Sequence, residues 1–142
     1  MNGYLDSSAL LKLLLGDESG GDHVRVEMDL FGQISTSRLT YVESLAALAA
    51  ARRSGRVARV DYDMAVADFD RIWSGLEVLE ITTTLAEDAA TAAETYGLRA
   101  GDAIQLASAR SLDASVVVLM AWDARLRTAA LASGLVCYPL EL

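Results

Sequence analysis

The sequence predicts an α/β fold built on a mainly parallel sheet. Short apolar segments rich in β-branched residues alternate with longer segments of helical periodicity along the chain. The clearest strand, Ser115–Met120, is apolar at every position after its serine, so both of its faces should be buried, as in parallel sheets. Glycines follow several of the helical segments, where helices commonly end. Together these observations favour alternating strands and helices packed in layers.

In the first half of the chain, turn residues separate the periodic segments. Leu39–Arg53 is an alanine-rich helical segment that stops near Gly55, and Asp61–Trp73 has its larger apolar residues spaced to share one face. The predicted strands are Gly3–Leu5 and Gln33–Ser37, and the predicted helices are Ala9–Leu15, Asp22–Phe31, Leu39–Arg53 and Asp61–Trp73.

The second half repeats the alternation. Gly97 stands directly after one helical segment, at the position that often ends a helix in a left-handed conformation. The predicted strands are Leu76–Ile81, Ser115–Met120 and Leu135–Tyr138, and the predicted helices are Thr84–Tyr96, Asp102–Leu112 and Asp123–Ser133.

Length and composition limit the classes of protein to consider. The 142 residues contain one proline, ten glycines and no internal repeat, so we expect a single domain over residues 1–142. No apolar run is long enough to span a membrane, and Asp6 interrupts the place where a signal peptide would be most apolar. The lone Cys137 cannot form an internal disulfide, so we expect a cytoplasmic protein without a membrane partner.

The formal net charge of −8 argues against a protein that simply coats nucleic acid. It does not argue against a nuclease that binds divalent cations, because such a site concentrates carboxylates and the ions then reverse the local charge.

Two aspartates stand at or shortly after the ends of predicted strands. Asp6 follows the first strand in "GYLDSSALL", and Asp123 follows the strongest strand in "LMAWDARLRTA". Taken alone, each is explained slightly better as a helix N-cap, although Ser7 and Ser8 could also cap the first helix. In parallel sheets, however, ligands bind beyond the carboxyl ends of the strands, and both aspartates stand there.

Two further acids lie on predicted helices. Asp102 falls in the first turn of its helix, where the helix dipole favours a negative charge. Glu43 is different, because the spacing predicts an apolar stripe of Leu39, Val42, Ala46 and Ala49 that includes its position. A carboxylate on an apolar face is costly unless it is paired, protonated or bound to a cation.

These four acids could meet in one pocket. Their charges would then repel and raise some of their pKa values, unless a divalent cation neutralised them. Oxygen ligands without a histidine or cysteine partner suit Mg²⁺ or Mn²⁺ rather than zinc, and His23 is the only histidine. Such a site would organise water and a phosphodiester for hydrolysis.

The blocks "YLDSSALLKL", "YVE", "LRAGDAIQLASA" and "WDARLRTAA" resemble the four acidic blocks of PIN-domain ribonucleases. Their order and separation resemble in particular the VapC toxins of bacterial toxin–antitoxin pairs, from end to end of the chain. The resemblance implies an α/β/α sandwich and Mg²⁺-dependent endoribonuclease activity. It also implies Asp6 and Asp102 as principal metal ligands, completed by Glu43 and Asp123.

The same resemblance implies partners. A VapB-like antitoxin would wrap the toxin, and a homodimer is expected, with the apolar residues of Asp61–Trp73 as a candidate surface. Two positions depart from the pattern of many relatives: Ala121 replaces Thr or Ser two residues before the last acid, and Gln105 replaces His. Neither change removes a metal-binding acid, but both bear on substrate positioning.

Several residues are candidates for contact with RNA. Arg52 and Arg53 belong to an arginine cluster after the Glu43 helix, which either caps that helix or grips phosphate through the guanidinium fork. Arg99 would either brace Asp102 or meet the scissile phosphate, and Ser8 is a further candidate.

Two other functions remain open from the sequence. A phosphoryl-accepting receiver domain also keeps acids at strand ends, but it needs a late lysine, and Lys12 is the only lysine. A non-catalytic RNA- or protein-binding module on the same scaffold is the main alternative.

Overall fold

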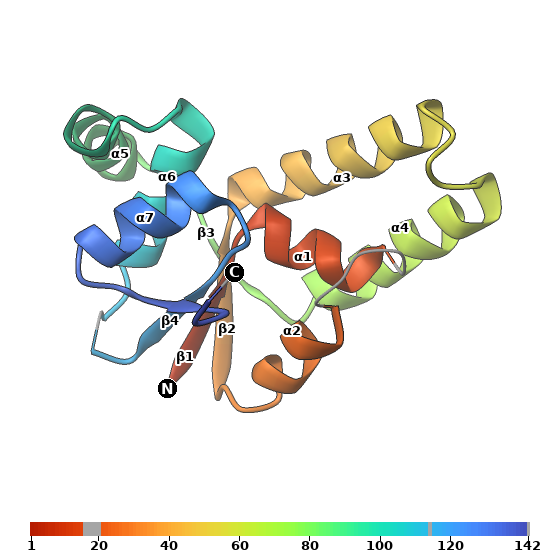
Figure 1. Ribbon diagram of the computed structural model, residues 1–142, viewed down its shortest axis with the longest axis horizontal. Helices are drawn as coiled ribbons and strands as arrows, with labels where there is room; N and C mark the ends of the chain where they lie inside the picture. Colours follow the sequence, from red (N-terminus) through yellow and green to blue (C-terminus); the bar gives the residue numbers. More distant parts are fainter. Residues whose placement is uncertain (16–20, 114, 142) are drawn as a thin grey trace.

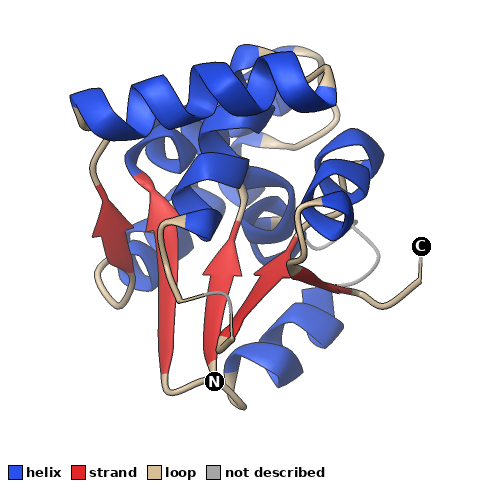
Figure 2. Cartoon of the chain, turned by 90° about the vertical axis from the view of Figure 1, so that its left-hand side faces the viewer, coloured by secondary structure: helices blue, strands red, loops and turns tan. Residues whose placement is uncertain are grey.

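The computed structural model describes residues 1–15, 21–113 and 115–141, without the side chain of His23. Within these residues, five strands form one sheet in the order β3-β2-β1-β4-β5 (Figure 1). All neighbouring strands are parallel, and the arrows at the centre of the sheet in Figure 2 point the same way. The prediction of an α/β fold on a mainly parallel sheet is therefore confirmed. The strands are β1 (Asn2–Leu5), β2 (Gln33–Ser37), β3 (Glu77–Leu79), β4 (Val117–Met120) and β5 (Val136–Tyr138).

The strand order reverses next to the central strand. From β1 the chain adds β2 and β3 on one side, and then returns to add β4 and β5 on the other. Leu5 at the end of β1 pairs with Met120 at the end of β4, and the backbone N–H of Asp6 donates to the Met120 carbonyl at 3.2 Å. The segments that follow these two strands therefore lie side by side at the switch point, where α/β sheets commonly bind ligands.

Helices cover both faces of the sheet, as an α/β/α sandwich requires. Successive strand residues point to opposite faces, so Leu5 packs in a core with α1 to α4, whereas Tyr4 packs in a core with α6 and α7. Among the described residues, no helix is long and apolar enough to cross a membrane. The helices are α1 (Ser7–Leu14), α2 (Gly21–Met28), α3 (Arg38–Arg53), α4 (Arg59–Trp73), α5 (Thr83–Tyr96), α6 (Ala100–Arg110) and α7 (Ala124–Ala132).

Each predicted element is present, with ends that differ by up to three residues. The predicted helix Asp22–Phe31 ends earlier because Phe31 turns back toward β1. A Cβ on Gly3 would lie 2.8 Å from the Phe31 ring and from the Met120 methyl group, so both side chains occupy the space that this glycine leaves open.

The expected apolar stripe on α3 is wrong. The residues of α3 that the fold buries are Thr40, Ser44, Leu48 and Ala51, whereas Val42 is 62% exposed. The alanine-rich sequence gives a weak periodic signal, and the polar Thr40 and Ser44 obscure the buried face. Glu43 is half-buried beside that face rather than in the middle of an apolar stripe.

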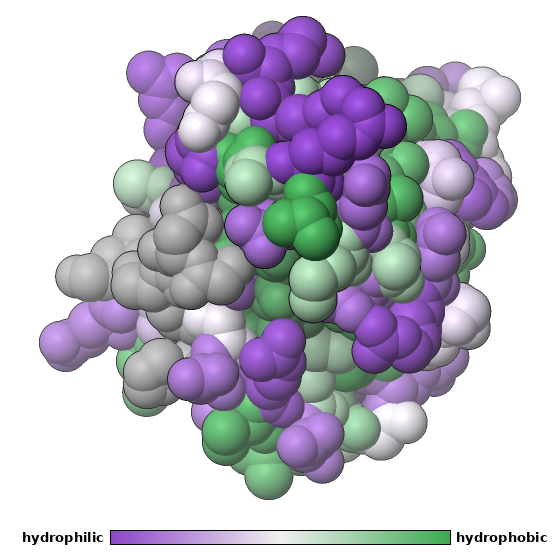
Figure 3. All heavy atoms as spheres, turned by 90° about the vertical axis from the view of Figure 1, so that its right-hand side faces the viewer, coloured by the Kyte–Doolittle hydropathy of each residue, from purple (hydrophilic) through white to green (hydrophobic). Residues whose placement is uncertain are grey.

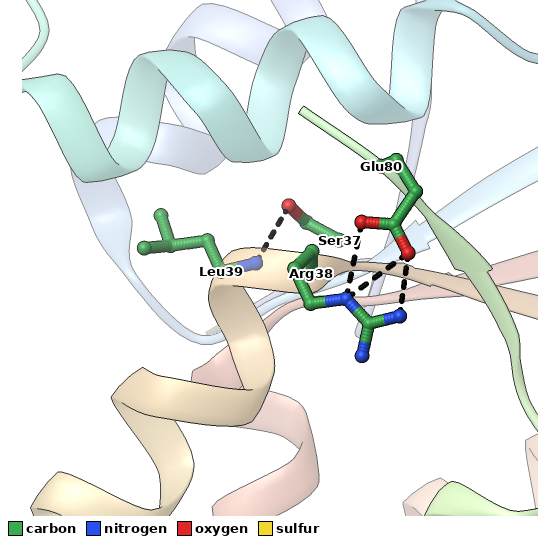
Figure 4. A network of polar contacts seen from close by, with 4 residues as sticks. All are labelled: Ser37, Arg38, Leu39 and Glu80. Atoms are coloured by element: carbon green, nitrogen blue, oxygen red, sulfur yellow. Dashed lines mark hydrogen bonds and ion pairs between the residues drawn. The ribbon is translucent and has the colours of Figure 1, made fainter. Parts of the chain in front are cut away.

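The beginning of α3 is joined to the end of β3 by polar contacts (Figure 4). Ser37 caps the helix by accepting a hydrogen bond from the Leu39 N–H at 3.1 Å. Arg38 forms an ion pair with Glu80, with 2.5 Å between Nη2 and Oε1, and this pair lowers the pKa of Glu80. Because both side chains are exposed, the pair adds little to stability and mainly connects the two elements.

α3 and α4 run side by side away from the sheet (Figure 1). Phe69 of α4 is fully buried, and its ring packs against Tyr41 and Trp73 at centroid distances of 5.3 and 5.4 Å. These aromatic residues therefore serve to pack α3 against α4. Fewer residues of Asp61–Trp73 are then available for the expected dimer surface. Met64, which is 61% exposed, is the large apolar side chain of that segment that faces outward.

Arg127 of α7 is buried although it carries a charge. Its guanidinium donates from Nη1 to the Ala121 carbonyl at 2.9 Å and from Nη2 to the Pro139 carbonyl at 2.5 Å. These bonds join the segment after β4 to the segment after β5. Cys137 of β5 is buried in the core beside it.

Candidate active site

Asp6 is a buried carboxyl group at the end of β1. It caps α1, because its Oδ1 accepts hydrogen bonds from the Ala9 N–H at 2.9 Å and from the Ser8 hydroxyl at 2.7 Å. The side chain is 4% exposed, and its pKa is raised to about 7 in spite of these two hydrogen bonds. Burial is the main cause of this rise, and the negative charges of Glu43 and Asp123 contribute to it. The surroundings of Asp6 therefore disfavour its ionised form.

Asp123 follows β4 after Ala121 and Trp122 and, like Asp6, precedes a helix. Its Oδ1 accepts a hydrogen bond from the Leu126 N–H at 2.9 Å and so caps α7. The Ser8 hydroxyl connects the two strand ends, because it donates to Asp6 and accepts from the Trp122 N–H at 2.8 Å. The capping role that the sequence favoured for both aspartates is confirmed. In both side chains the capping hydrogen bond goes to Oδ1. One aspartate can therefore cap a helix and also take part in a site.

Glu43 reaches the same region from α3. Its Oε1 accepts hydrogen bonds from the Ser7 hydroxyl at 2.7 Å and from Nε2 of Gln105 at 2.9 Å. Its Oε2 lies at the beginning of α6, 3.2 Å from where a Cβ on Gly101 would stand. The half-buried carboxylate is thus stabilised by two neutral donors, which the sequence did not predict.

Asp102, in the first turn of α6, is partly buried and faces Arg99. The Arg99 guanidinium lies 3.4 Å from its Oδ2, so the expected bracing contact is present. Burial raises the pKa of Asp102, the charge of Asp123 raises it further, and the charge of Arg99 opposes both effects. The charge of Glu43 also acts on it, more weakly.

The charges of two of the four acids act on the other two. The pKa values of Asp6 and Asp102 are both raised by the charges of Glu43 and Asp123. In the part of the chain that the structure describes, no three carboxylate, imidazole or thiol groups already surround one point as a metal site. The donor set nevertheless fits a hard divalent cation, because it consists of carboxylate oxygens whose mutual repulsion such an ion would relieve.

The remaining candidate residues differ in their distance from the acids. Arg52 and Arg53 are exposed at the far end of α3, nine or ten residues after Glu43, which is about 14 Å along the helix. The Arg52 guanidinium lies over the Tyr62 ring, 5.3 Å from its centroid. Arg99 is 69% exposed and contacts Asp102 directly, so of these three arginines it is the one beside an acid of the candidate site.

The comparisons with known proteins decide the family. A family model described as the PIN domain matches residues 3–130. Ribonuclease VapC45 of Mycobacterium tuberculosis (strain CDC 1551 / Oshkosh) is 35% identical over 139 residues, which cover 98% of this chain and 96% of that protein. The chain belongs to the PIN-domain family.

Solved structures share the fold of this PIN domain. FitAcB from Neisseria gonorrhoeae superposes with a TM-score of 0.73 at 17% identity, over 99% of both chains. A toxin-antitoxin complex from Klebsiella pneumoniae superposes with a TM-score of 0.55 at 20% identity, over 85% of this chain and 86% of the other. At these identities the likeness establishes the shared fold.

The PIN domain also holds polar residues that the sequence did not single out as functional. Tyr4, Ser7 and Thr40 surround Gln105, which we noted only as a departure from relatives. One signal could have found this group: Gln105 lies three residues after Asp102, and thus on the same side of its helix.

Proposed function

We propose that this PIN-domain protein is a metal-dependent endoribonuclease of the VapC type, the toxin of a toxin–antitoxin pair. The observation that carries the proposal is the carboxyl group of Asp6, buried at the switch point of the sheet with its pKa raised to about 7. A buried acid with so strongly raised a pKa is a candidate functional group. The near full-length likeness to a protein named a ribonuclease supports the same activity.

In this proposal Asp6 and Asp102 are the principal ligands of Mg²⁺ or Mn²⁺, and Glu43 and Asp123 complete the set. The bound ion would supply positive charge for the phosphodiester and for activating water. The capping hydrogen bonds hold Asp6 and Asp123 in place before binding, so these side chains lose little freedom when the ion arrives.

Arg99 is the residue that we assign to the RNA backbone. Its side chain is exposed beside Asp102, and a guanidinium binds phosphate oxygens through paired N–H groups. Arg52 and Arg53 would meet RNA farther along the chain of nucleotides, because they stand at the far end of α3.

The antitoxin would bind over α4. A hollow of about 440 Å³ is lined there by apolar residues of α1 and α4 and by charged residues of both signs. Figure 3 looks at this side of the molecule and shows apolar side chains lying among hydrophilic ones. A partner segment with spaced apolar residues and mixed charges would fit this surface. Residues that line the hollow include Leu13, Leu14, Val57, Met64 and Ala65.

RNA cleavage tests the proposed activity. The purified protein should cut RNA with Mg²⁺ or Mn²⁺, stop on addition of excess chelator, and lose the activity in Asp6→Asn and in Asp102→Asn. Asp88→Asn, an exposed acid on α5, is the matched control and should remain active. RNA binding without cleavage in any metal would favour the non-catalytic module, and cleavage indifferent to chelator would refute the metal mechanism.

Co-purification tests the partner. Expression from the native operon should yield a complex, and Met64→Glu should weaken it by placing a charge on the apolar surface. Leu131→Glu, at an exposed apolar position of α7, is the control and should not. Sizing the isolated protein tests the expected homodimer.

A further inference from the structure

Gln105 lies at the centre of a group of polar side chains to which the proposed mechanism gives no role. It stands on α6, one turn after Asp102, and is 3% exposed. A polar side chain so deeply buried is costly unless it is hydrogen-bonded. The partners of Gln105 come from three other elements and are Tyr4 of β1, Ser7 of α1, and Thr40 and Glu43 of α3.

The direction of these hydrogen bonds follows from the chemistry of Glu43. An ionised carboxylate only accepts hydrogen bonds, so the amide nitrogen of Gln105 must face it, at 2.9 Å. The amide oxygen then points toward the Tyr4 hydroxyl, which donates to it at 2.6 Å. Tyr4 thereby opposes rotation of the amide group, which would turn its oxygen against the carboxylate.

The same contacts determine how Glu43 is oriented. Its Oε1 accepts both from Gln105 and from the Ser7 hydroxyl, the latter at 2.7 Å. Its Oε2 is thereby directed to the beginning of α6, close to Gly101 and one residue from Asp102. A chain of hydrogen bonds thus runs from the buried Tyr4 to a carboxylate of the candidate site.

We propose that Gln105, itself oriented by Tyr4, is a positioning residue that holds the Glu43 carboxylate ready to bind a divalent cation. This inference rests on the proposed function, because it takes Glu43 as one of the ligands. A ligand that is already oriented needs no ordering when the ion binds. Loss of a hydrogen-bonding partner behind a metal ligand typically weakens metal affinity by about 10- to 100-fold.

Mn²⁺ binding by the full chain tests the inference without RNA cleavage. The electron paramagnetic resonance signal of free Mn²⁺ reports the Kd directly. Gln105→Met keeps the length of the side chain but removes its hydrogen bonds, so the Kd should rise about 10-fold. Tyr4→Phe removes only the hydroxyl that orients the amide, so it should cause a smaller rise in the same direction.

A second set of measurements separates positioning from stability. In the double variant Tyr4→Phe/Gln105→Met, neither of the two side chains keeps an unpaired polar group. The double variant should therefore recover part of the stability that Gln105→Met loses. It should recover none of the Mn²⁺ affinity. Leu106→Val, in the same helix, should lose stability through packing and keep wild-type affinity. In RNA cleavage by Gln105→Met, two quantities should change: the Mn²⁺ concentration that gives half-maximal rate should rise, and kcat at saturating Mn²⁺ should fall. The first should change by the larger factor.

The outcomes distinguish the two proposals. Wild-type affinity in Gln105→Met, or affinity that returns together with stability in the double variant, would overturn the positioning role and leave the proposed function standing. A wild-type protein that binds no Mn²⁺ would overturn the proposed function, and the inference with it.

Discussion

At the scale of single residues, Asp6 combines a favourable and an unfavourable role. As a helix cap it satisfies a backbone N–H that would otherwise lack a partner, a contribution of about 1 kcal/mol. As a buried acid beside Glu43 and Asp123 it is costly to ionise. The cap needs only an oxygen, whereas cation binding needs the charge. Substitution by asparagine therefore separates the two roles.

The metal-free protein should lose stability as the pH rises from about 4 to about 7. The pKa of Asp6 is raised from 3.8 to about 7, so in this window the unfolded chain ionises while the folded chain keeps its proton. The folded state binds more protons there, and the free energy of unfolding falls with pH by about 4 kcal/mol. Asp6→Asn lacks this loss, so its stability relative to wild type should increase across the window.

Urea unfolding at pH 4.5 and pH 8 in the presence of chelator measures this difference. Asp88→Asn is again the control and should follow the wild type at both pH values. An Asp6→Asn variant whose relative stability is the same at pH 4.5 and pH 8 would contradict the assigned pKa.

Arg99→Gln should shift the pH dependence of RNA cleavage. The charge of Arg99 opposes the rise in the pKa of Asp102, so removing it raises that pKa further. A protonated Asp102 cannot act as a ligand, and the acidic limb of the rate profile should therefore move to higher pH. The shift should be small, because exposed ion pairs are weak.

Rate profiles at low salt and at 1 M salt test this effect, since salt screens an exposed charge and should reduce the difference between Arg99→Gln and wild type. A uniform loss of rate at every pH would instead indicate that Arg99 acts through the RNA.

At the scale of elements, the candidate site is made by the ends of strands and the beginnings of helices. α1 and α7 begin with the two capping aspartates, and α6 begins beside Glu43. The contact between α3 and α6 is close because Gly101 has no side chain, so that Oε2 of Glu43 can approach the backbone.

Gly101→Ala should separate stability from activity. Alanine favours a helix over glycine by up to about 1 kcal/mol, which would stabilise α6. The added methyl group would stand 3.2 Å from Oε2 of Glu43 and push the carboxylate aside by a few tenths of an ångström. We expect an unchanged or higher Tm together with weaker Mn²⁺ binding. Equal Mn²⁺ affinity in Gly101→Ala and wild type would show that the position of Oε2 is unimportant.

At the scale of the whole molecule, the two halves of the sheet meet at the site, and buried polar side chains hold them together. Ser8 connects the ends of β1 and β4, and Arg127 connects the segments after β4 and β5. Since Ala121 and Asp123 belong to the same short segment, Arg127 also fixes the backbone that leads to one of the acids.

Arg127→Met should destabilise the protein by about 2 kcal/mol, because two hydrogen bonds from a charged donor are lost and two carbonyl groups are left without it. Urea unfolding measures the loss. Arg125→Met, at an exposed position of the same helix, is the control and should change stability little. Equal stability of the two variants would show that the guanidinium does not hold β5.

Much of this fold could be predicted from the sequence, because strands buried on both faces and helices ended by glycine leave local signals. Gln33–Ser37 was predicted with its observed ends, and the acids that follow β1 and β4 could be placed near the same edge of the sheet from topology alone. Glu43 was selected for a wrong reason, since the apolar stripe assigned to α3 is not the buried face: Val42 and Ala46 are exposed.

The polar interior could not be predicted in this way. Thr40 and Gln105 are buried together because the Gln105 amide donates a hydrogen bond to the Thr40 hydroxyl across two helices. Arg127 is buried because the Ala121 and Pro139 carbonyl groups accept from it. Such pairings depend on contacts between residues far apart in the chain, and an amphipathic pattern assigns polar residues to the surface.

The double use of Asp6 and Asp123 has a consequence for inactive members of such a fold. A mutation to asparagine would remove the negative charge in a single step and keep the oxygen that begins the helix. If the two aspartates bind the cation as proposed, activity would then be lost while the architecture persists. A mutation to alanine would remove both. In a chain that keeps this scaffold only to bind a partner, we therefore expect asparagine rather than alanine at these two positions. Such a chain should also have a higher Tm than the one with both aspartates.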